Sequence, residues 1–298
     1  MIITDCHVHS CFSSDSETPV EAMIEQAIAK NFSYFYLTDH MDYEFPVYEE
    51  GMDFLFNVDE YFAKLEMLKP KYKSSKIEIR PSIELGLKPH LREDYRKLLK
   101  DYPFDFVIGS THLINDLDPY NNEFWEGRSE KDCLIAYFET MIENIRSFPE
   151  FDSLGHLDYA IRYAPSVKHA TEQAMKQLGN AKNMNLSNIL HNTNCLIHYQ
   201  YKDYADYIDE ALKLLIHHGI ALEVNTAGYA KGLGQPNPKM DVLKRYKEFG
   251  GELITIGSDG HTKDAYAFGF EQAEELLKKI GFRYYTIFKQ RKAEMIGF

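Results

Sequence analysis

Short apolar runs alternate with longer amphipathic stretches along most of this chain. A short apolar run predicts a buried strand, whereas apolar residues recurring every three to four positions predict a helix. The alternation is typical of βα units, in which helical crossovers join parallel strands. The expected strands cover residues 1–9, 32–40, 76–85, 104–112, 151–156, 220–226 and 252–261.

Three helical stretches carry boundary signals in the sequence. Thr18-Pro19-Val20-Glu21 has the form of a capping box with proline at the first helical position. Gly219 is placed to end a helix over residues 204–218, and Gly281 to end one over residues 271–279. The first of these helices would bury one face, made of Val20, Met23, Ile24, Ala27 and Ile28.

Parallel βα units form either an open sheet or a closed barrel, and seven of them favour a distorted or incomplete barrel over an eight-fold one. At 298 residues the chain is expected to be a single domain over residues 1–298. Residues 169–202, rich in Asn and Gln, interrupt the pattern and are interpreted as a partly helical insertion or lid. Residues 43–58 combine acidic and aromatic side chains in an irregular segment, a candidate substrate-facing loop.

Charge and composition narrow the class of protein. A net charge of −13 disfavours broad nucleic-acid binding, because an acidic surface repels phosphate backbones. No apolar run approaches the roughly 18 residues that cross a bilayer, and no export leader is evident, so a cytoplasmic protein without a membrane partner is expected. The cysteines are scattered and are expected to be reduced thiols: Cys6, Cys11, Cys133 and Cys195.

Residues able to bind metals stand at the ends of six of the seven expected strands, and the chain has 12 histidines. In a parallel barrel these carboxyl ends meet at one face, where active sites form. The sixth strand offers an amide instead, Asn225. The predicted metal ligands at the strand ends are His7, His9, His40, Glu84, His112, His156, Asp259 and His261.

Strand geometry orients these side chains. Residues two apart point the same way, so His7 and His9 share a face, as do Asp259 and His261. Asp39 precedes His40 and is expected to point away from the metal and orient an imidazole. A single histidine at a strand end is weak evidence for a metal site, so the prediction depends on the occurrence of such residues at many strand ends. The other histidines are interpreted as surface residues: His90, His169, His191, His198, His217 and His218.

The strand ends lie in short motifs: Asp5-Cys6-His7-Val8-His9-Ser10, Thr38-Asp39-His40, Ile83-Glu84, Gly109-Ser110-Thr111-His112, Gly155-His156-Leu157-Asp158 and Gly257-Ser258-Asp259-Gly260-His261. Two further stretches are Glu223-Val224-Asn225-Thr226-Ala227-Gly228 and Lys231-Gly232-Leu233-Gly234. Together these motifs resemble the PHP family (polymerase and histidinol phosphatase domain) nearly from end to end. The last two stretches resemble, more narrowly, its phosphatase branch.

The resemblance implies a distorted (β/α)7, TIM-like barrel with two or three divalent metal ions at the carboxyl ends of its strands. By position, it implies a first metal held by His7, His9, Glu84 and Asp259, with Glu84 bridging to a second held by His112 and His156. A third would be bound by His40, His261 and a residue of the loop after the first strand. Many relatives have histidine in that loop, where this sequence offers Asp15 in Ser13-Ser14-Asp15-Ser16.

Mixed imidazole and carboxylate ligands suit zinc, manganese or iron. Two bridged metals would supply a hydroxide to attack a phosphate ester. Arg162 is a candidate for bidentate phosphate binding and Lys231 a weaker one. Asp42 and Asp158 are candidate general acids for the leaving alkoxide, with histidine-holding acceptors as the alternative role for both.

The expected activity is hydrolysis of L-histidinol phosphate, a small phosphate monoester, in histidine biosynthesis. One alternative is another PHP phosphoesterase acting on nucleotides or other small esters. A second is a metal-binding regulatory protein without turnover, which the full ligand set disfavours. The oligomeric state is left open.

Overall fold

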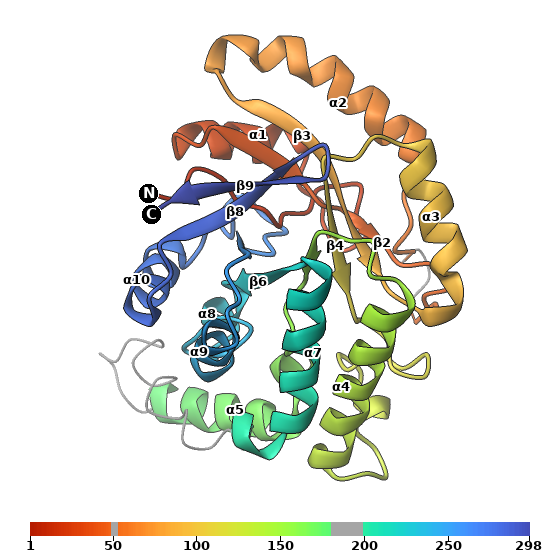
Figure 1. The fold of residues 1–298 in the computed structure, drawn as a ribbon, viewed down its shortest axis with the longest axis vertical. Helices are drawn as coiled ribbons and strands as arrows, with labels where there is room; N and C mark the ends of the chain where they lie inside the picture. Colours follow the sequence, from red (N-terminus) through yellow and green to blue (C-terminus); the bar gives the residue numbers. More distant parts are fainter. Residues whose placement is uncertain (49–52, 180–198) are drawn as a thin grey trace.

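The apolar runs form parallel strands that curl around a common axis (Figure 1). The computed structural model describes residues 1–48, 53–179 and 199–298. Two strands of this sheet, β1 and the short β2 (His40–Met41), pair with the same strand, β3, one after the other. The other strands lie in the order β1 (Tyr34–Leu37), β3 (Glu78–Gly86), β4 (Phe106–Ser110), β5 (Ser153–Leu154), β6 (Ala221–Asn225) and β7 (Ile254–Gly257).

Helices alternate with the strands and cover the outside of the sheet (Figure 1). The distorted (β/α)7 barrel is therefore confirmed, because each parallel step of the sheet is made through a helical crossover. The helices are α1 (Val20–Ala29), α2 (Val58–Tyr72), α3 (Arg92–Asp101), α4 (Glu130–Ser147), α5 (Pro165–Gly179), α7 (Ala205–His218), α8 (Ala227–Ala230), α9 (Met240–Glu248) and α10 (Phe270–Ile280).

The first expected strand closes the barrel without being a continuous strand. Its residues lie between β7 and β1: the Cys6 N–H donates to the Ile256 carbonyl, and the Val8 carbonyl accepts from the Thr38 N–H, both at 2.9 Å. The prediction of a full strand over residues 1–9 is wrong, since only Val8 forms a bridge, with Gly260. The Val8 N–H donates to the hydroxyl of Thr38 instead of a carbonyl, which interrupts the ladder.

The N-terminus of α1 also differs from expectation. Pro19 is the N-cap of this helix, and no side chain caps it, so the predicted capping box is wrong. The hydroxyl of Thr18 donates instead to the carbonyl of His261, 2.9 Å away, and therefore links the loop after the first segment to the end of β7. The predicted glycine stops are confirmed: Gly219 and Gly281 follow α7 and α10 in the left-handed region.

The chain ends in an antiparallel hairpin of β8 (Tyr284–Lys289) and β9 (Lys292–Gly297). The sequence pattern did not predict this hairpin, which packs against one end of the barrel. The carbonyl of Phe288 accepts hydrogen bonds from Tyr36 and the buried Arg80. The Phe288 ring stacks on Phe106 at 5.1 Å. The N-terminal segment joins this region, because the N–H of Ile3 donates to the hydroxyl of Tyr285. The hairpin therefore fills the end of the barrel where the strands begin.

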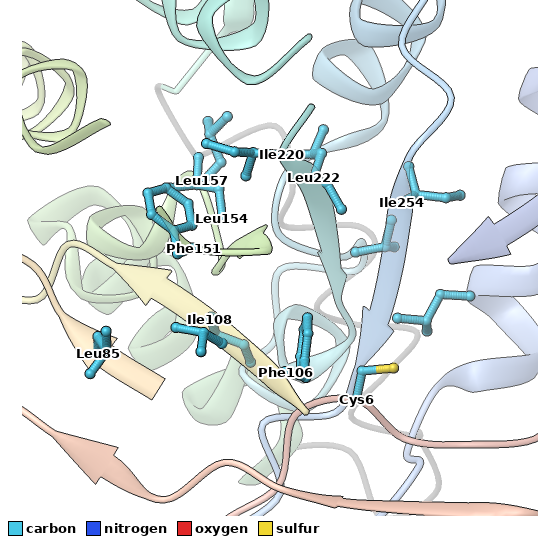
Figure 2. Close-up of a cluster of buried hydrophobic side chains, with 14 of the residues drawn as sticks. Cys6, Leu85, Phe106, Ile108, Phe151, Leu154, Leu157, Ile220, Leu222 and Ile254 are labelled. Carbon is cyan, nitrogen blue, oxygen red and sulfur yellow. The ribbon is translucent and has the colours of Figure 1, made fainter. Parts of the chain in front are cut away.

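The two faces of the sheet have different chemistry. Leu154, Leu222 and Ile254 stand in register on neighbouring strands and form a buried apolar row (Figure 2). Because side chains alternate along a strand, the residues next to them face the other way. The hydroxyls of Ser153 and Thr255 meet there at 2.7 Å. Polar side chains thus face the interior of the barrel, as the candidate site requires.

Other expectations have simple outcomes. Across the described ranges, no helix combines the length and apolar character needed to cross a bilayer. Cys6, Cys11 and Cys133 are free thiols, as predicted. Much of the 169–202 segment, together with Cys195, His191 and His198, lies outside the described residues, although α5 covers its first part.

Gly257 gives a test of how tightly β7 packs on the first segment. In Gly257→Ala, the new methyl group would overlap the Cβ of His7 and the Oε1 of Glu223. We expect a loss of about 1–3 kcal/mol in the free energy of unfolding, measured with denaturant. Gly297→Ala is the control, because its methyl group would meet only the Tyr284 ring at 3.9 Å. Equal stabilities for the two variants would contradict this account of the packing.

Candidate metal centre

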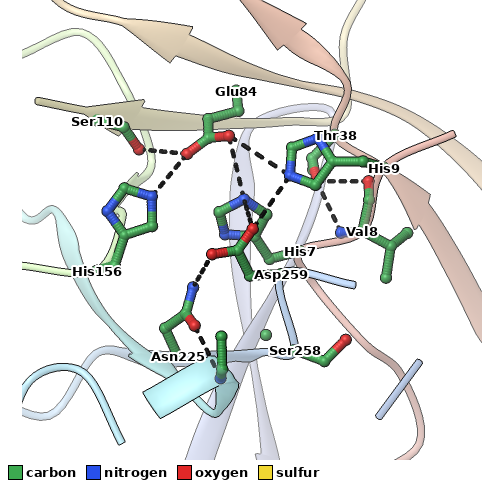
Figure 3. A network of polar contacts seen from close by, with 12 residues as sticks. His7, Val8, His9, Thr38, Glu84, Ser110, His156, Asn225, Ser258 and Asp259 are labelled. Atoms are coloured by element: carbon green, nitrogen blue, oxygen red, sulfur yellow. Dashed lines mark hydrogen bonds and ion pairs between the residues drawn. The ribbon is translucent and has the colours of Figure 1, made fainter. Parts of the chain in front are cut away.

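The predicted ligands converge at the carboxyl end of the barrel. Figure 3 shows His7, His9, Glu84, His156 and Asp259 turned toward one another. The predicted ligands come from the first segment, β2, β3 and the loops after β4, β5 and β7. Within each group, one donor atom per residue lies within 4.8 Å of the others. The groups are His7, His9 and Asp259; His7, Glu84 and His156; His40, Glu84 and His112; and His9, His40 and His261.

Glu84 stands at the centre of this cluster, fully buried, with its two oxygens facing different imidazoles. Its Oε2 lies 3.2 Å from Nε2 of His7 and 3.0 Å from Nδ1 of His40. Its Oε1 lies 3.0 Å from Nε2 of His156 and 3.3 Å from Nε2 of His112. Metal–ligand bonds of about 2.1 Å in a tetrahedral site separate ligand atoms by about 3.4 Å. The spacing therefore suits a carboxylate shared between metal ions.

Unsatisfied nitrogens provide an independent test of the fit to metal. Nε2 of His7, His9 and His261 and Nδ1 of His40 are buried without a hydrogen-bond partner in the described residues, and so is Oε2 of Glu84. Buried polar atoms are almost always paired, because an unpaired one costs about 1–3 kcal/mol. Their convergence indicates that cations complete this cluster.

Burial would raise the pKa of Glu84, but His7, His40 and His112 hold that pKa well below its usual range. Burial acts the same way on Asp259, and there Arg162 and His7 outweigh it, so its pKa is also well below the usual range. Both carboxylates are therefore ionised at neutral pH and available as ligands.

The loop after the first segment brings Asp15 to the third group. Its Oδ2 lies 3.0 Å from Nε2 of His261 and 3.7 Å from Nε2 of His40. Burial alone would raise the pKa of Asp15, but His40 and His261 outweigh it and lower that pKa. The structure thus brings the carboxylate to the position expected for a third ligand, and its role in binding metal stays a prediction.

Glu223, to which sequence reasoning gave no role, holds two of the ligands. Its Oε1 accepts from Nδ1 of His7 at 2.6 Å, and its Oε2 accepts from the backbone N–H of His156 at 2.6 Å. A carboxylate on Nδ1 fixes the tautomer and leaves Nε2 free for a metal. The available signal was spacing: Glu223 lies two residues before Asn225 on β6, so the two share a face, and Asn225 donates to Glu223.

Asp42, a candidate general acid, holds another ligand. Its Oδ2 accepts from Nδ1 of His112 at 2.9 Å. Gly86 makes room for it, because a methyl group there would overlap the Asp42 carboxylate. The geometry supports the alternative role of a histidine-holding acceptor, and general-acid catalysis by Asp42 stays a prediction.

Asp39 acts on His9 through a serine. The hydroxyl of Ser13 donates to Asp39 Oδ1 at 2.8 Å and lies 3.2 Å from Nδ1 of His9. Asp39 also accepts from the backbone N–H of Ser10 at 2.6 Å. The predicted orienting role is therefore supported, with Ser13 as an intermediary that the sequence did not indicate.

Asp158, the second candidate acid, pairs with groups outside the predicted ligand set. It accepts from Nδ2 of Asn237 at 2.5 Å and from the N–H of Lys239 at 3.2 Å. Its burial raises its pKa. It lines a cavity of about 360 Å³ together with Tyr199. The carboxylate contacts no predicted ligand in the described residues, so its role in proton transfer stays a prediction.

The two predicted phosphate-binding cations lie beside the centre. Arg162 is buried and donates to Asp259 at 2.7 Å, Asn225 at 2.7 Å and Asn237 at 2.9 Å. Its guanidinium therefore holds a ligand carboxylate in place. Desolvation and the nearby Arg162 lower the pKa of Lys231. No described carboxylate lies within ion-pair distance of Lys231. Phosphate binding by either residue stays a prediction.

The histidines assigned to the surface behave as expected where the structure describes them. His90 is 62% exposed and pairs with Glu44. His169 is exposed on α5, and His217 and His218 end α7. Position at a strand end, and not histidine content, therefore separates the two sets.

A distorted (β/α)7 barrel whose buried carboxylate faces two sets of imidazoles defines a class of barrel proteins with clustered residues able to bind metal at the carboxyl ends of the strands. Comparison with known proteins gives the family. The PHP domain model matches residues 5–227, so the chain belongs to the PHP domain family.

Individual relatives match over nearly the full length. A probable histidinol-phosphatase of Clostridium acetobutylicum is 32% identical over 277 residues, covering 93% of each chain. The histidinol-phosphatase of Lactococcus lactis is 29% identical over 296 residues, 97% of this chain and 96% of that protein. A crystal structure of histidinol phosphate phosphatase from Lactococcus lactis, complexed with zinc, L-histidinol and phosphate, superposes with a TM-score of 0.79 at 28% identity over 98% of both chains.

Replacing the Glu223 carboxylate with an amide should weaken metal binding. In Glu223→Gln, an amide N–H would face the N–H of His156 or the Nδ1–H of His7, because one of the two oxygens is lost. We expect zinc affinity to fall about 10- to 100-fold, measured by competition with a chromogenic chelator. Glu271→Gln, an exposed change on α10, is the control and should bind zinc as the unmodified protein does. Unchanged affinity in Glu223→Gln would exclude this role.

Metal removal should lower stability, because the cluster buries imidazoles and carboxylates that a cation would pair. At a free zinc concentration about 100-fold above Kd, bound metal adds about 2.7 kcal/mol to the free energy of unfolding. Chelator-treated protein should unfold at lower denaturant concentration, and added zinc should restore the midpoint. Superimposable curves with and without zinc would contradict a folded-state metal site.

Proposed function

We propose that this protein is a metal-dependent phosphomonoesterase that hydrolyses L-histidinol phosphate to L-histidinol and phosphate, a step of histidine biosynthesis. The observation that carries the proposal is the pair of imidazole sets around Glu84, buried at the carboxyl end of the barrel. The substrate is supported by full-length relatives called histidinol-phosphatase and by the similar structure that holds zinc, L-histidinol and phosphate.

We assign two to three divalent ions to this centre, as zinc, manganese or iron. The ligands would be His7, His9, Asp15, His40, Glu84, His112, His156, Asp259 and His261. Such ions activate water for attack on phosphorus and offset the charge of the phosphoryl oxygens.

The protein itself supplies orientation and charge. Glu223 and Asp42 keep the Nδ1 protons of His7 and His112 turned away from the centre. Arg162 fixes Asp259, and Lys231 offers a cation to the phosphate of the substrate. The leaving alkoxide requires a proton, for which Asp42 and Asp158 stay the candidates. A cytoplasmic location and the lack of a nucleic-acid partner also stay predictions.

Glu84→Gln tests the central claim. Loss of the shared negative charge should lower kcat/KM for histidinol phosphate by at least about 100-fold, measured by phosphate release. Glu271→Gln, an exposed charge removal on α10, is the control. Full activity in Glu84→Gln would contradict the mechanism.

A substrate panel tests the specificity of the unmodified protein. Histidinol phosphate, a nucleoside monophosphate and a short single-stranded DNA are compared by kcat/KM with zinc or manganese present. We expect histidinol phosphate to give the highest value. A higher value for the nucleotide would reassign the substrate within the same family.

A further inference from the structure

Two asparagines hold one edge of the Arg162 guanidinium. Asn225 ends β6, and Asn237 lies in the loop between α8 and α9. The N–H of each donates to the backbone carbonyl of the other, at 2.7 and 2.8 Å, and the two residues form an antiparallel bridge. Their side-chain carbonyls accept from the guanidinium, Asn225 from Nη2 at 2.7 Å and Asn237 from Nε at 2.9 Å. Because Nε and Nη2 belong to the same edge, the bridge fixes that edge.

The amide of Asn237 is held in a single orientation by its two neighbours. Its Oδ1 faces Arg162, because a guanidinium only donates hydrogen bonds. Its Nδ2 donates to Oδ1 of Asp158 at 2.5 Å, and Oδ2 of Asp158 accepts from the backbone N–H of Lys239 at 3.2 Å. Asp158 and Asn237 are both only 1% exposed. Asp158 therefore acts on Arg162 through the amide of Asn237.

Tight packing confines the amide and the guanidinium. A methyl group at Gly228, in α8, would lie 2.3 Å from the carbonyl oxygen of Gln235 and 3.1 Å from Oδ1 of Asn237. This helix therefore packs directly on the segment that carries the asparagine. The ring of Tyr159 covers one face of the Arg162 guanidinium, with its centroid 5.6 Å from Cζ. The edge and one face of the guanidinium are thus both in contact with the protein.

The guanidinium keeps donors and charge for a further partner. Its third contact is with Asp259, a predicted metal ligand that accepts from Nη1, so the edge made by Nη1 and Nη2 adjoins the metal centre. In the described part of the chain, three of the five N–H donors are engaged, which leaves one on each of Nη1 and Nη2. Only one of the three acceptors is a carboxylate. The neutral asparagine carbonyls orient Arg162 without offsetting its charge.

From this network we propose that Asn237, oriented by Asp158, is a positioning residue: it holds the Arg162 guanidinium through a neutral acceptor, so that the two remaining donors are directed to the phosphoryl group. The identity of that group rests on the proposed phosphatase activity. Asn237 acts on the reaction only through Arg162, because a bidentate contact with phosphate depends on the plane in which the guanidinium is held.

Asn237→Ala tests the proposal, because it removes the acceptor of Nε and keeps the backbone bridge. In zinc-loaded protein freed of excess metal, we expect the affinity for inorganic phosphate, measured by titration calorimetry, to fall about 10-fold. Zinc affinity should change less than about threefold, since Arg162 keeps its contact with Asp259. Asn122→Ala, an exposed replacement of the same kind, should leave phosphate affinity unchanged. Unchanged phosphate affinity in Asn237→Ala would overturn the proposal.

A double-mutant cycle separates positioning from a general structural effect. In an Arg162→Ala background, Asn237→Ala should change phosphate affinity less than about twofold, because the group through which it acts is missing. Arg162→Lys serves as the background if Arg162→Ala does not fold, since lysine keeps a cation and lacks the planar edge that the asparagines hold. A 10-fold loss from Asn237→Ala in either background would exclude an action through Arg162.

Asp158→Asn tests the outer part of the network. The amide has one oxygen for two donors, Nδ2 of Asn237 and the N–H of Lys239, so the orientation of Asn237 is lost. We expect kcat/KM to fall by similar factors, about 10-fold, for histidinol phosphate and p-nitrophenyl phosphate, because the two share the phosphoryl group. A loss confined to histidinol phosphate, whose alkoxide requires a proton, would assign general-acid catalysis to Asp158 and contradict its positioning role.

Phosphate binding without turnover distinguishes failure of this inference from failure of the proposed function. If histidinol phosphate is not hydrolysed but Asn237→Ala weakens phosphate binding only when Arg162 is present, the assigned substrate is wrong and the positioning role stands. If histidinol phosphate is hydrolysed and Asn237→Ala binds phosphate as the unmodified protein does, the positioning role is wrong and the proposed function stands.

Discussion

The burial of a charged carboxylate in the middle of the barrel is the constraint on which the rest of this structure depends. An isolated ionised carboxylate has a large desolvation cost, so Glu84 requires positive charge on every side. Imidazoles alone supply it only by becoming protonated, and six of them packed together would repel one another. Divalent ions resolve both difficulties, because neutral imidazoles and ionised carboxylates are then ligands.

A second set of carboxylates explains how flexible imidazole rings are held in position. Glu223 and Asp42 bind the Nδ1 atoms of His7 and His112 directly, whereas Asp39 acts on His9 through Ser13. Glu223 and Asp39 are themselves fixed by backbone donors, the N–H groups of His156 and Ser10. The close contact between Gly257 and His7 extends the same constraint to the backbone. The protein's own contacts therefore fix the orientation of the imidazoles, and such preorganisation reduces the reorganisation required for catalysis.

The two cations beside the centre, Arg162 and Lys231, are paired differently. Arg162 donates to Asn237, Asp259 and Asn225 and so stabilises Asp259. Lys231 has no carboxylate partner within ion-pair distance among the described residues. Tyr159 lies between Arg162 and Asp118: its ring centroid is 5.6 Å from the Arg162 guanidinium, and its hydroxyl is 3.5 Å from Asp118.

The sequence by itself determined the order of the parallel strands and their helical crossovers and which side chains gather at the carboxyl ends, because both follow from local periodicity and from the rule that parallel strands end at one face. It also located Gly219 and Gly281, whose left-handed conformations are local properties. Tertiary structure alone decided the role of Glu223, the diversion of Thr18 to His261, and the interruption of the first strand by Thr38. Each of these is a hydrogen bond between residues at least 30 positions apart, so its partner is set by how the barrel closes, and no pattern along the chain records that distance.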